Sequence, residues 1–343
     1  MKGIILHGGH GTRLRPLTHT GPKQLLKIAN KPMSQYALED LRDAGITDIA
    51  IIIGDVYPDK VKELYGDGTK FGVKITYVFQ DHPKGIAHAI GLCKEFVGKE
   101  KFVVYLGDNI LRKGLQSYVS NFSSSDDSAL ILLSEVTNPS QFGIAKIENK
   151  EIVEIIEKPK HPPSNLAVIG VYFLTPEIFP IIENLKPSWR NELEITEALQ
   201  ELISTKNPPV FDYVSGWWKD TGTPDDVLHA NQLILETLVK DNDNYTQIGE
   251  GSKIHSMAKI SGPVLIGKNC VIGQSAIIGP NVSIGDNSNL DLCSIKNSII
   301  MDECEVNSKI IIEDSIVSDG TKITGNFSNK FNMLLGERSK IRF

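Results

Sequence analysis

Three glycines and an arginine lie together directly after the first apolar run of the chain. Gly8, Gly9 and Gly11 are followed at once by Thr12 and Arg13. Glycines let a backbone approach a phosphate chain closely, and the planar arginine side chain matches phosphate oxygens. The segment lacks the third glycine of a dinucleotide-binding loop and the Gly-Lys-Ser/Thr ending of a P-loop. We therefore expect a different kind of triphosphate-binding loop; the alternative is a flexible turn with a solvated arginine.

Two aspartates lie where strands are expected to end. Asp108 follows the apolar run 102–106, and Asp220 comes at the end of a second short strand. A parallel sheet presents its ligands beyond the carboxyl ends of its strands, so two such carboxylates can come together. They could hold one Mg²⁺, a hard cation that prefers oxygen ligands and bridges phosphates. Either aspartate alone could instead cap a strand or a turn.

The elements that must position these residues alternate along the first two-thirds of the chain. Strands are predicted over residues 3–7, 49–53, 75–79, 102–106 and 129–133, and helices over 33–44, 61–65 and 86–96. A further helix is predicted from Pro224, with Thr223 as its N-cap, to about Lys240. This order is typical of an α/β domain with a mostly parallel, Rossmann-like sheet and helices on both faces. We place this domain at residues 1–240.

A different pattern follows the polar stretch 241–244. Apolar side chains recur at every sixth residue, at Ile254, Ile260, Ile266, Ile272, Ile278, Ile284 and Leu290, and four of them precede glycine: Gly267, Gly273, Gly279 and Gly285. Three hexapeptides make one triangular turn of a parallel β-helix. The spacing slips after Leu290 and resumes at Ile300, Val306 and Ile312, which predicts a bulge. We predict a left-handed β-helix domain with a C-terminal tail over 241–343, because a β-sandwich would show a period of two instead.

Ordered motifs link these elements to a known family. They are the loop 6–16, Pro22-Lys23-Gln24-Leu25-Leu26, Lys31-Pro32-Met33, and the segments 80–89, 106–109, 142–143, 157–159, 190–196 and 218–223. Together they resemble the sugar-nucleotide pyrophosphorylases, and Lys-Gln-Leu-Leu is similar to the glucose-1-phosphate thymidylyltransferases. The β-helix tail is similar to the longer subgroup of that family. The resemblance implies an enzyme that joins dTTP to glucose 1-phosphate with Mg²⁺ and releases pyrophosphate.

The resemblance also implies roles for particular residues. Arg13, Lys23 and Lys158 would be catalytic, with Arg13 on the leaving pyrophosphate and the two lysines around the α-phosphate and the sugar phosphate. Asp108 and Asp220 would bind the metal. Nucleotide-binding positions would be Leu6, Gly8, Gly9, Gly11, Thr12, Arg13, Gln24, Gln80, Pro83, Gly85 and Asp108. Sugar-phosphate-binding positions would be Gly143, Glu157, Lys158, Val168 and Arg190.

Physical chemistry limits how far the substrates can be specified. The amide of Gln80 can pair with the O and N–H edge of thymine or uracil, and Gly8 and Gly85 leave room for the ring. One methyl group is worth only about 1–3 kcal/mol in a pocket, so UTP stays open beside dTTP. Glu157 can accept hydrogen bonds from hexose hydroxyls or could be an exposed ion-pair partner. An N-acetylhexosamine 1-phosphate is an alternative acceptor.

Five positions depart from the usual pattern of the family. His7 and His10 replace small residues, Lys27 replaces a proline, His88 a glutamine and Asn191 a glycine. Proton transfer is assigned to neither His7 nor His10, because in-line phosphoryl chemistry needs no catalytic histidine. His7 could lie against the nucleobase or occupy a polar cavity beneath the loop.

Composition excludes several other classes. The net charge is −6 and the cations are scattered, so neither a nucleic-acid partner nor a membrane is expected. Cys93, Cys270, Cys293 and Cys304 form no metal or disulfide pattern and are predicted to be small buried side chains, as suits a cytoplasmic protein. A β-helix serves oligomerisation or acyl transfer; with His255 alone in the repeat, we favour a scaffold and expect a homo-oligomer. A degenerate, non-enzymatic paralogue is the remaining alternative.

Overall fold

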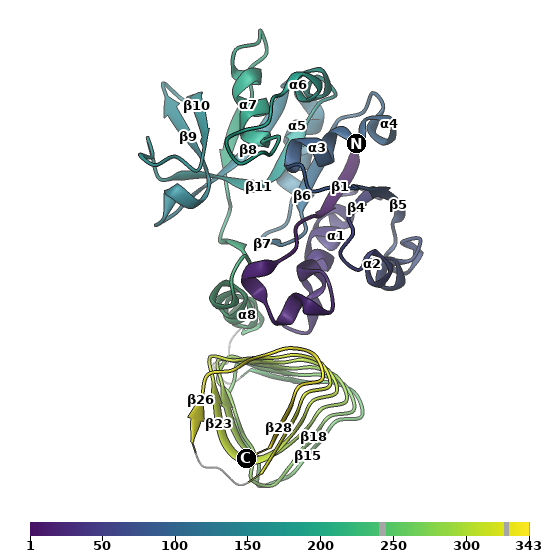
Figure 1. The fold of residues 1–343 in the computed structure, drawn as a ribbon, viewed down its shortest axis with the longest axis vertical. Helices are drawn as coiled ribbons and strands as arrows, with labels where there is room; N and C mark the ends of the chain where they lie inside the picture. The colour runs from purple at the N-terminus through teal and green to yellow at the C-terminus, as the bar shows by residue number, and fades with distance from the viewer. Residues whose placement is uncertain (240–244, 326–328, 343) are drawn as a thin grey trace. The chain divides into compact units, whose positions relative to one another are not determined.

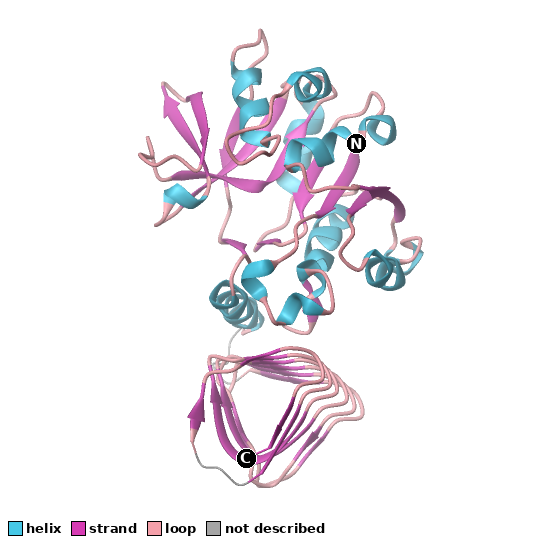
Figure 2. Cartoon of the chain, in the orientation of Figure 1, coloured by secondary structure: helices cyan, strands magenta, loops and turns pink. Residues whose placement is uncertain are grey.

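The chain forms two compact units. The computed structural model describes residues 1–239, 245–325 and 329–342. One unit comprises Met1–Gly9 and Ser34–Asp220, and the other comprises His10–Met33 and Thr221–Phe343 (Figures 1 and 2). The predicted polar stretch 241–244 and the predicted helix end at Lys240 lie outside the described residues, and the domain boundary at 240/241 stays a prediction.

The first unit is built on a nine-stranded sheet with the order β10-β9-β11-β6-β1-β4-β5; β8 pairs with β11 and β12 pairs with β8. The strands are β1 (Lys2–His7), β4 (Asp48–Ile53), β5 (Lys74–Phe79), β6 (Phe102–Leu106), β8 (Ala129–Glu135), β9 (Gly143–Glu148), β10 (Glu151–Glu157), β11 (Leu166–Leu174) and β12 (Val210–Tyr213). A separate two-stranded ribbon joins β7 (Asn109–Leu111) to β13 (Trp218–Asp220). All five strands predicted from the sequence are present.

The sheet is mixed rather than mostly parallel. Strands β5, β4, β1 and β6 are parallel, as are β12 and β8. Strand β11 runs antiparallel to β6, β8 and β9, and β9 and β10 form an antiparallel pair. The parallel part nevertheless brings the carboxyl ends of β1, β4, β5 and β6 to one edge, which is where a ligand site is expected.

Helices cover both faces of this sheet, as predicted. They are α1 (Met33–Asp43), α2 (Pro58–Tyr65), α3 (Ile86–Gly91), α4 (Lys94–Val97), α5 (Gln116–Ser124), α6 (Ile178–Asn184) and α7 (Ile195–Ile203), with short 3-10 turns at Thr69–Phe71 and Pro139–Gln141. Helices α3, α6 and α7 share a core with Ile4 and Val104, whereas Tyr105, next along β6, donates a hydrogen bond to Asp40 of α1. The helix predicted over 86–96 is instead two helices, because Leu92 and Cys93 between them leave the helical pattern.

The second unit contains the glycine-rich segment, a long helix and the β-helix. The segment holds three 3-10 turns, Thr12–Leu14, Leu17–His19 and Lys23–Leu25, and a hairpin of β2 (Lys27–Ile28) and β3 (Lys31–Pro32). Helix α8 (Pro224–Leu238) begins as predicted: the Thr223 side chain accepts from the Asp226 N–H, and the Asp226 side chain accepts from the Thr223 N–H. This reciprocal cap satisfies backbone donors that a helix start leaves unpaired.

The C-terminal strands wind into a parallel β-helix, which Figure 1 shows as a triangular coil. They are β14 (Thr246–Ile248), β15 (Lys253–Ile254), β16 (Lys259–Ile260), β17 (Val264–Ile266), β18 (Val271–Ile272), β19 (Ile277–Ile278), β20 (Val282–Ile284), β21 (Asn289–Lys296), β22 (Ile299–Ile300), β23 (Glu305–Glu313), β24 (Ile316–Val317), β25 (Lys322–Gly325), β26 (Lys330–Phe331), β27 (Leu334–Leu335) and β28 (Lys340–Arg342). Val271 pairs with Lys253 behind it and Asn289 ahead, so one coil takes 18 residues there.

The interior of the coil is the predicted aliphatic column. Ile266, Ile272, Ile278, Ile284 and Leu290 are all 1% exposed or less, whereas Ile254 and Ile260 of the first coil are only partly buried. The predicted bulge is also present, because the register between β21 and β23 shifts between Asp291 and Cys293. The four cysteines are unpaired and buried, as predicted. The cysteines therefore contribute to the two apolar cores as small side chains and not as disulfides.

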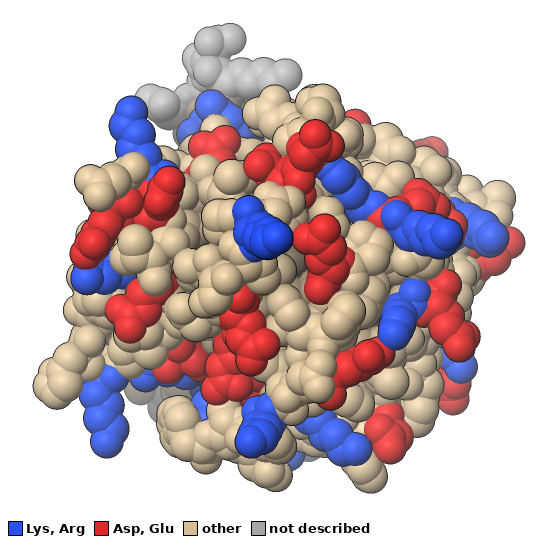
Figure 3. All heavy atoms as spheres, turned by 90° about the horizontal axis from the view of Figure 1, so that it is seen from above, with Lys and Arg blue, Asp and Glu red and all other residues tan. Residues whose placement is uncertain are grey.

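Charge is distributed evenly over the face of the molecule shown in Figure 3. Lysine and arginine side chains alternate there with aspartate and glutamate, and neither sign forms a continuous area. Within the described residues, no helix has the length and apolar character needed to cross a bilayer. The face shown thus lacks the basic stripe that would follow a nucleic-acid backbone.

Candidate active site

Three predicted motifs meet at the carboxyl edge of the parallel strands. The Gly8 and Gly9 turn follows β1, Gln80 follows β5, and Asp108 follows β6 after one residue. Backbone bonds extend the sheet beyond the strands: Gln80 N–H donates to Ile53 O at 2.9 Å, and Gly107 N–H donates to Leu6 O at 3.0 Å. The edge is therefore ordered by the same ladder that builds the sheet.

The β7–β13 ribbon brings the two aspartates together. Asp220 lies opposite Asn109, the residue after Asp108. The buried Asn109 side chain donates to Asp108 Oδ1 at 3.1 Å, while its own oxygen accepts from Trp218 Nε1 at 2.6 Å and from Gly170 N–H at 3.2 Å. Because all its partners are fixed, Asn109 orients the Asp108 carboxylate. Asn109 belongs to the motif 106–109, but its positioning role has no signal in the local sequence.

The buried Tyr172 is affected by the charges of four carboxylates. Burial raises the pKa of Tyr172 well above its ordinary range, and the charges of Glu157, Asp108, Asp220 and Glu194 raise it further. Each of these carboxylates must therefore lie close enough to disfavour a phenolate at this position.

The donor set of this region fits magnesium. No cluster of three or more His, Cys, Asp and Glu side chains suited to a metal occurs in the described ranges, so the site offers two carboxylates and few other ligands. Mg²⁺ is commonly held by one or two carboxylates, with waters and substrate phosphates completing its shell. Zinc would instead need three or four nitrogen or sulfur ligands from the protein.

Glu157 lies at the end of β10 and is held from two directions. Its Oε1 accepts from Arg190 Nη1 at 3.1 Å, and its Oε2 accepts from Thr196 Oγ1 at 3.1 Å. Burial raises the pKa of Glu157 above its ordinary value, while Lys158, Thr196 and Arg190 oppose that rise. Each carboxylate oxygen has two lone pairs, so capacity is left for hydroxyl groups of a ligand. Glu157 is thus partly buried, with 17% of its side chain exposed, and it forms ion pairs with Arg190 and Lys158; its contact with a hexose stays a prediction.

Lys158 occupies an unusual backbone position directly after β10. Its φ is +43°, and its N–H donates to Phe142 O at 3.0 Å. Left-handed backbone is uncommon for a lysine and persists only where the surroundings hold it. Its Nζ lies 3.6 Å from Glu157 Oε1.

Gly143, at the start of β9, has no space for a side chain, since a Cβ there would lie 2.5 Å from Thr196 Cγ2. Val168 is a buried residue of β11.

Arg190 is surrounded by carboxylates. It pairs with Glu157 at 3.1 Å, Glu192 at 3.0 Å and Glu194 at 3.4 Å, and Glu194 is only 5% exposed. To bind a sugar phosphate, Arg190 would have to exchange at least one of these partners. The next residue, Asn191, has a φ of +61°, which explains why the family usually has glycine there and why asparagine can replace it.

The predicted base-binding motif packs against the same segment. Leu193 N–H donates to Lys84 O at 2.7 Å and Ala87 N–H donates to Leu193 O at 3.1 Å. A Cβ on Gly85 would lie 2.4 Å from the Leu193 oxygen, so this packing alone requires glycine. The buried Gln80 side chain contacts His88, with Nε2 and Nδ1 2.9 Å apart. His88 therefore occupies one end of the amide, and Pro83 lies in the connecting loop.

The remaining nucleotide residues lie on the glycine-rich segment of the second unit, apart from Leu6, Gly8 and Gly9 in the first. Gly11 has a φ of +58°, and a Cβ there would lie 3.0 Å from Thr18 and 3.2 Å from Lys23. The Thr18 hydroxyl donates to Gly11 O at 2.9 Å. The exposed Arg13, beside Thr12, lies against Gly222, where a Cβ would meet Nη2 at 2.9 Å. Gln24 is 1% exposed. The shared substrate contacts predicted for these residues stay a prediction.

Most of the chain matches one known protein family. Residues 2–237 match the family described as nucleotidyl transferase. The chain is a nucleotidyl transferase. Residues 260–342 match a second family, the GMPPB C-terminal domain. The first match, over residues 2–237, includes all the motifs that resemble the sugar-nucleotide pyrophosphorylases.

Known proteins similar to this nucleotidyl transferase fall in the same class. The low-salt glycan biosynthesis nucleotidyltransferase Agl11 of Haloferax volcanii is 47% identical, and the match covers 94% of each chain. A glucose-1-phosphate thymidylyltransferase of Streptomyces antibioticus is 40% identical over 99% of each chain. A UDP-glucose pyrophosphorylase solved with UDP-glucose superposes with a TM-score of 0.61 at 30% identity, over 69% of this chain and 98% of that one.

His7 of this nucleotidyl transferase is buried without a polar partner. It is 6% exposed, neither ring nitrogen has a hydrogen-bond partner among the described residues, and its ring meets Tyr65 edge-on at 6.0 Å. Burial lowers the pKa of His7 to about 3, which the charge of Asp108 only partly offsets. The ring is thus neutral at neutral pH. His10 is exposed.

This burial predicts acid sensitivity. The unfolded chain binds a proton on His7 below its ordinary pKa of 6.5, whereas the folded chain binds one only near 3, so stability is lost as the pH falls between these values. The loss should approach about 1 kcal/mol per pH unit. The denaturant midpoint of His7→Leu minus that of the native chain should therefore be larger at pH 5 than at pH 7. Parallel curves for the two proteins would contradict the prediction.

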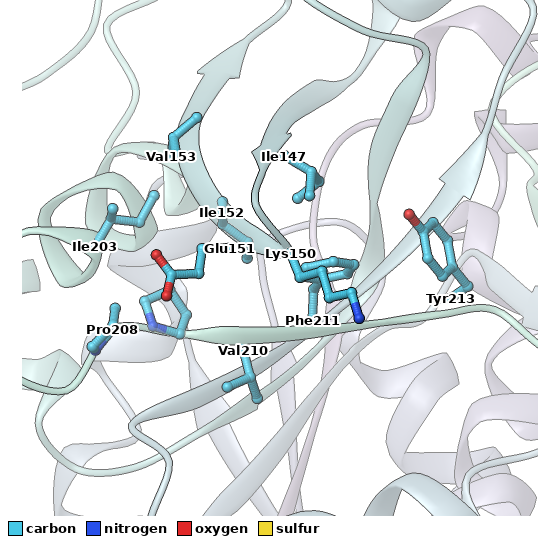
Figure 4. A pocket seen from close by; sticks show the side chains of 11 residues that line it. Ile147, Lys150, Glu151, Ile152, Val153, Ile203, Pro208, Val210, Phe211 and Tyr213 are labelled. Carbon is cyan, nitrogen blue, oxygen red and sulfur yellow. The ribbon is translucent and has the colours of Figure 1, made fainter.

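A groove of about 850 Å³ lies elsewhere on the first unit. Ile147, Val153, Val210 and Phe211 give it a mainly apolar lining, with Lys150 among the few charged side chains (Figure 4). It lies between β9, β10, β12 and the end of α7, and it contains none of the residues predicted to bind nucleotide, sugar phosphate or metal. The groove is therefore not the transferase site.

Proposed function

We propose that this protein transfers a thymidylyl group from dTTP to α-D-glucose 1-phosphate, giving dTDP-glucose and pyrophosphate with Mg²⁺. One observation carries the proposal: the β7–β13 ribbon sets Asp220 opposite Asn109, whose side chain donates to Asp108, so two carboxylates suited to a metal come from neighbouring backbone positions at the carboxyl edge of the sheet. The family membership supports the reaction class. The name of the Streptomyces antibioticus relative supports dTTP and glucose 1-phosphate.

The chain's own residues would bind and align the two substrates. Glu157, partly buried and fixed by Arg190 and Thr196, accepts hydrogen bonds from hexose hydroxyls. Lys158, held in place by its backbone, neutralises the sugar phosphate and the α-phosphate together with Lys23. Gln80, whose Nε2 contacts His88, presents its remaining amide groups to a pyrimidine edge. Val168 and Gly143 shape the sugar pocket.

The transfer itself needs little covalent participation by the protein. An oxygen of the sugar phosphate attacks the α-phosphorus, a new P–O bond forms, and the bond to the β-phosphate oxygen breaks in line. Arg13 would hold the oxygens of the departing pyrophosphate with its planar fork. Mg²⁺, when bound by Asp108 and Asp220, would neutralise charge that develops on the phosphates. Alignment and charge neutralisation therefore account for the rate enhancement.

Two other substrates and one other activity compete with this proposal. UTP is the principal alternative, because the similar UDP-glucose pyrophosphorylase was solved with UDP-glucose. An N-acetylhexosamine 1-phosphate is a second acceptor. Acyl transfer would need a catalytic histidine, but His255 is exposed in a turn, where its Nδ1 accepts from Met257 N–H at 3.2 Å. A homo-oligomer and a cytoplasmic location stay predictions.

A substrate panel tests the proposal. The purified protein is incubated with each of dTTP, UTP, ATP and GTP and with glucose 1-phosphate or N-acetylglucosamine 1-phosphate, and pyrophosphate release is measured with Mg²⁺ or EDTA. We expect the largest kcat/KM for dTTP with glucose 1-phosphate, UTP weaker by about 10- to 200-fold, and no release with EDTA. A larger kcat/KM for UTP than for dTTP would make UTP the proposed nucleotide substrate. Acetyl transfer in a separate assay with acetyl-CoA would overturn the scaffold role of the β-helix.

A further inference from the structure

The glycine-rich segment is attached to the β-helix by its hairpin. The turn between β2 and β3 is formed by Ala29 and Asn30, whose φ angles are +47° and +62°. Asn30 Nδ2 donates to the backbone oxygen of Ile284 at 2.7 Å, and Lys27 forms an ion pair with Asp302. We call these two contacts, together with the contact of Ala29 described next, the hairpin brace. All of it lies within the second unit.

A buried asparagine of α8 joins the hairpin to the coil. The oxygen of Asn231 accepts from Ala29 N–H at 2.9 Å and from the Ser283 hydroxyl at 2.9 Å. Asn231 is 1% exposed and Ser283 is fully buried. Buried polar groups are costly when unpaired, so this three-way contact fixes the hairpin turn, α8 and β20 in one arrangement.

The ion pair of the brace joins a row of stacked aspartates. Asp286 N–H donates to Asp302 Oδ1 at 3.0 Å, and Asp302 N–H donates to Asp319 Oδ1 at 3.0 Å. A Cβ on Gly285 would lie 2.3 Å from Asp302 Oδ1, so the glycine of the preceding coil is what admits this carboxylate. Burial raises the pKa of Asp319, and the charge of Lys27 opposes that rise. Lys27 therefore supplies the positive charge that this acidic corner needs.

The brace connects directly to residues with proposed catalytic roles. Lys23 and Gln24 precede β2 by only a few residues, and the hairpin is closed by Met33 N–H donating to Leu26 O at 3.0 Å. Lys23 in turn packs against Gly11. The same segment also meets the last coil, because a Cβ on Gly336 would lie 3.3 Å from Pro16 O. Contacts with the β-helix thus occur on both sides of Lys23.

We propose that the β-helix positions the triphosphate-binding segment, and that Lys27, Asp302 and Asn231 are positioning residues for the transfer. The inference rests on the proposed function, because it takes Lys23 and Arg13 as triphosphate ligands. It explains the lysine that replaces the usual proline of the family at position 27: this lysine has an ion-pair partner 275 residues away. The β-helix is then part of the catalytic apparatus without touching substrate.

A double-mutant cycle tests the ion pair. Asp302→Asn keeps an oxygen for the Asp286 N–H, and Lys27→Met keeps an apolar stem. We expect each single variant to raise the KM for dTTP about tenfold, because small displacements of phosphate ligands are costly. The double variant should be no worse than either single one, since both remove the same interaction. The KM for glucose 1-phosphate should rise by less than the KM for dTTP, because Lys23 is the segment's proposed contact with the sugar phosphate whereas Glu157 and its partners lie outside the segment.

Glu305→Gln is the matched control. It breaks an exposed ion pair with Lys322 on the same β-helix and should leave both KM values unchanged. Additive effects of Lys27→Met and Asp302→Asn, an equal rise in both KM values, or no rise at all would overturn the proposal.

Amide hydrogen exchange of residues 12–26 provides a readout that does not depend on activity. Exchange should quicken in Lys27→Met and in Asn231→Leu but not in Asn231→Asp, which keeps the acceptor for Ala29. Unchanged exchange in the first two variants would overturn the brace even if activity fell. If the native protein released no pyrophosphate with any substrate pair, the proposed function would fail. Amide hydrogen exchange of residues 12–26 would still test whether the hairpin brace holds the segment.

Discussion

Asp108→Asn and Asp220→Asn are each expected to lower kcat by about 10³-fold or more. Both substitutions keep the size of the side chain and remove the charge that a bound magnesium ion needs. Asp108 is 9% exposed and its Oδ1 accepts from Asn109, an arrangement that an asparagine can retain in part, so the fold should survive. Steady-state pyrophosphate release, measured across a range of Mg²⁺ concentrations, gives the answer.

A surface aspartate serves as the comparison for both variants. Asp43→Asn removes an exposed acid at the end of α1 that pairs with Arg42 at 2.8 Å, and kcat should change by no more than about twofold. Circular dichroism and thermal melting should show that the two site variants are folded. Full activity in Asp108→Asn or Asp220→Asn would remove that residue from the metal site and weaken the proposed chemistry.

Arg13→Met is expected to lower kcat/KM by about 10²- to 10³-fold, because the leaving pyrophosphate would lose its planar, two-donor partner. Arg13→Lys should recover only part of this loss, since an ammonium group cannot form the same fork. Gly222→Ala offers a conservative route to the same defect: the added Cβ would lie 2.9 Å from Arg13 Nη2 and turn the flexible guanidinium aside. We expect about a tenfold loss there with little change in thermal stability.

The neighbouring Arg15 provides the control for charge alone. Arg15 is exposed in the same loop and has no assigned role, so Arg15→Met should change kcat/KM by only a fewfold through the general field. Similar losses in Arg13→Met and Arg15→Met would show that the loop acts through net charge and not through a specific contact. The effect should also weaken with added salt if the field alone were responsible.

Local sequence patterns predicted the elements well where periodicity was strong. The six-residue spacing from Ile254 to Leu290 and its slip correspond to the coils and the bulge of the β-helix, because an interior column must be apolar at every corner. The direction of β11 was not predictable: residues 166–174 are almost all buried, and an apolar run carries no mark of parallel or antiparallel pairing. Single-residue changes such as the break at Cys93 are equally hard to see from composition.

For the site, the motifs predicted which residues matter but not how they are held. Asn109 and Thr196 lay within quoted motifs, yet their roles depend on partners such as Gly170 and Glu157 that lie far away in the sequence. Of the three carboxylates around Arg190, Glu157 is also distant in the sequence. The left-handed backbone of Lys158 has no local signal, because neither glycine nor asparagine occupies that position. Long-range packing determines these features, and one sequence read locally does not contain it.

The hairpin brace also has a consequence for the order in which the chain matures. Its contacts join residues 202, 254 and 275 positions apart, whereas successive coils stack on neighbours about 18 residues away. Contacts between distant residues can form only after the later residue has left the ribosome, and domains generally fold from the N-terminus during synthesis. The glycine-rich turn is among the first segments to be made and among the last to gain its native neighbours. A nascent chain interrupted before residue 302 would carry every strand of the nine-stranded sheet without the acid that pairs with Lys27, so its glycine-rich segment would lack this contact with the β-helix.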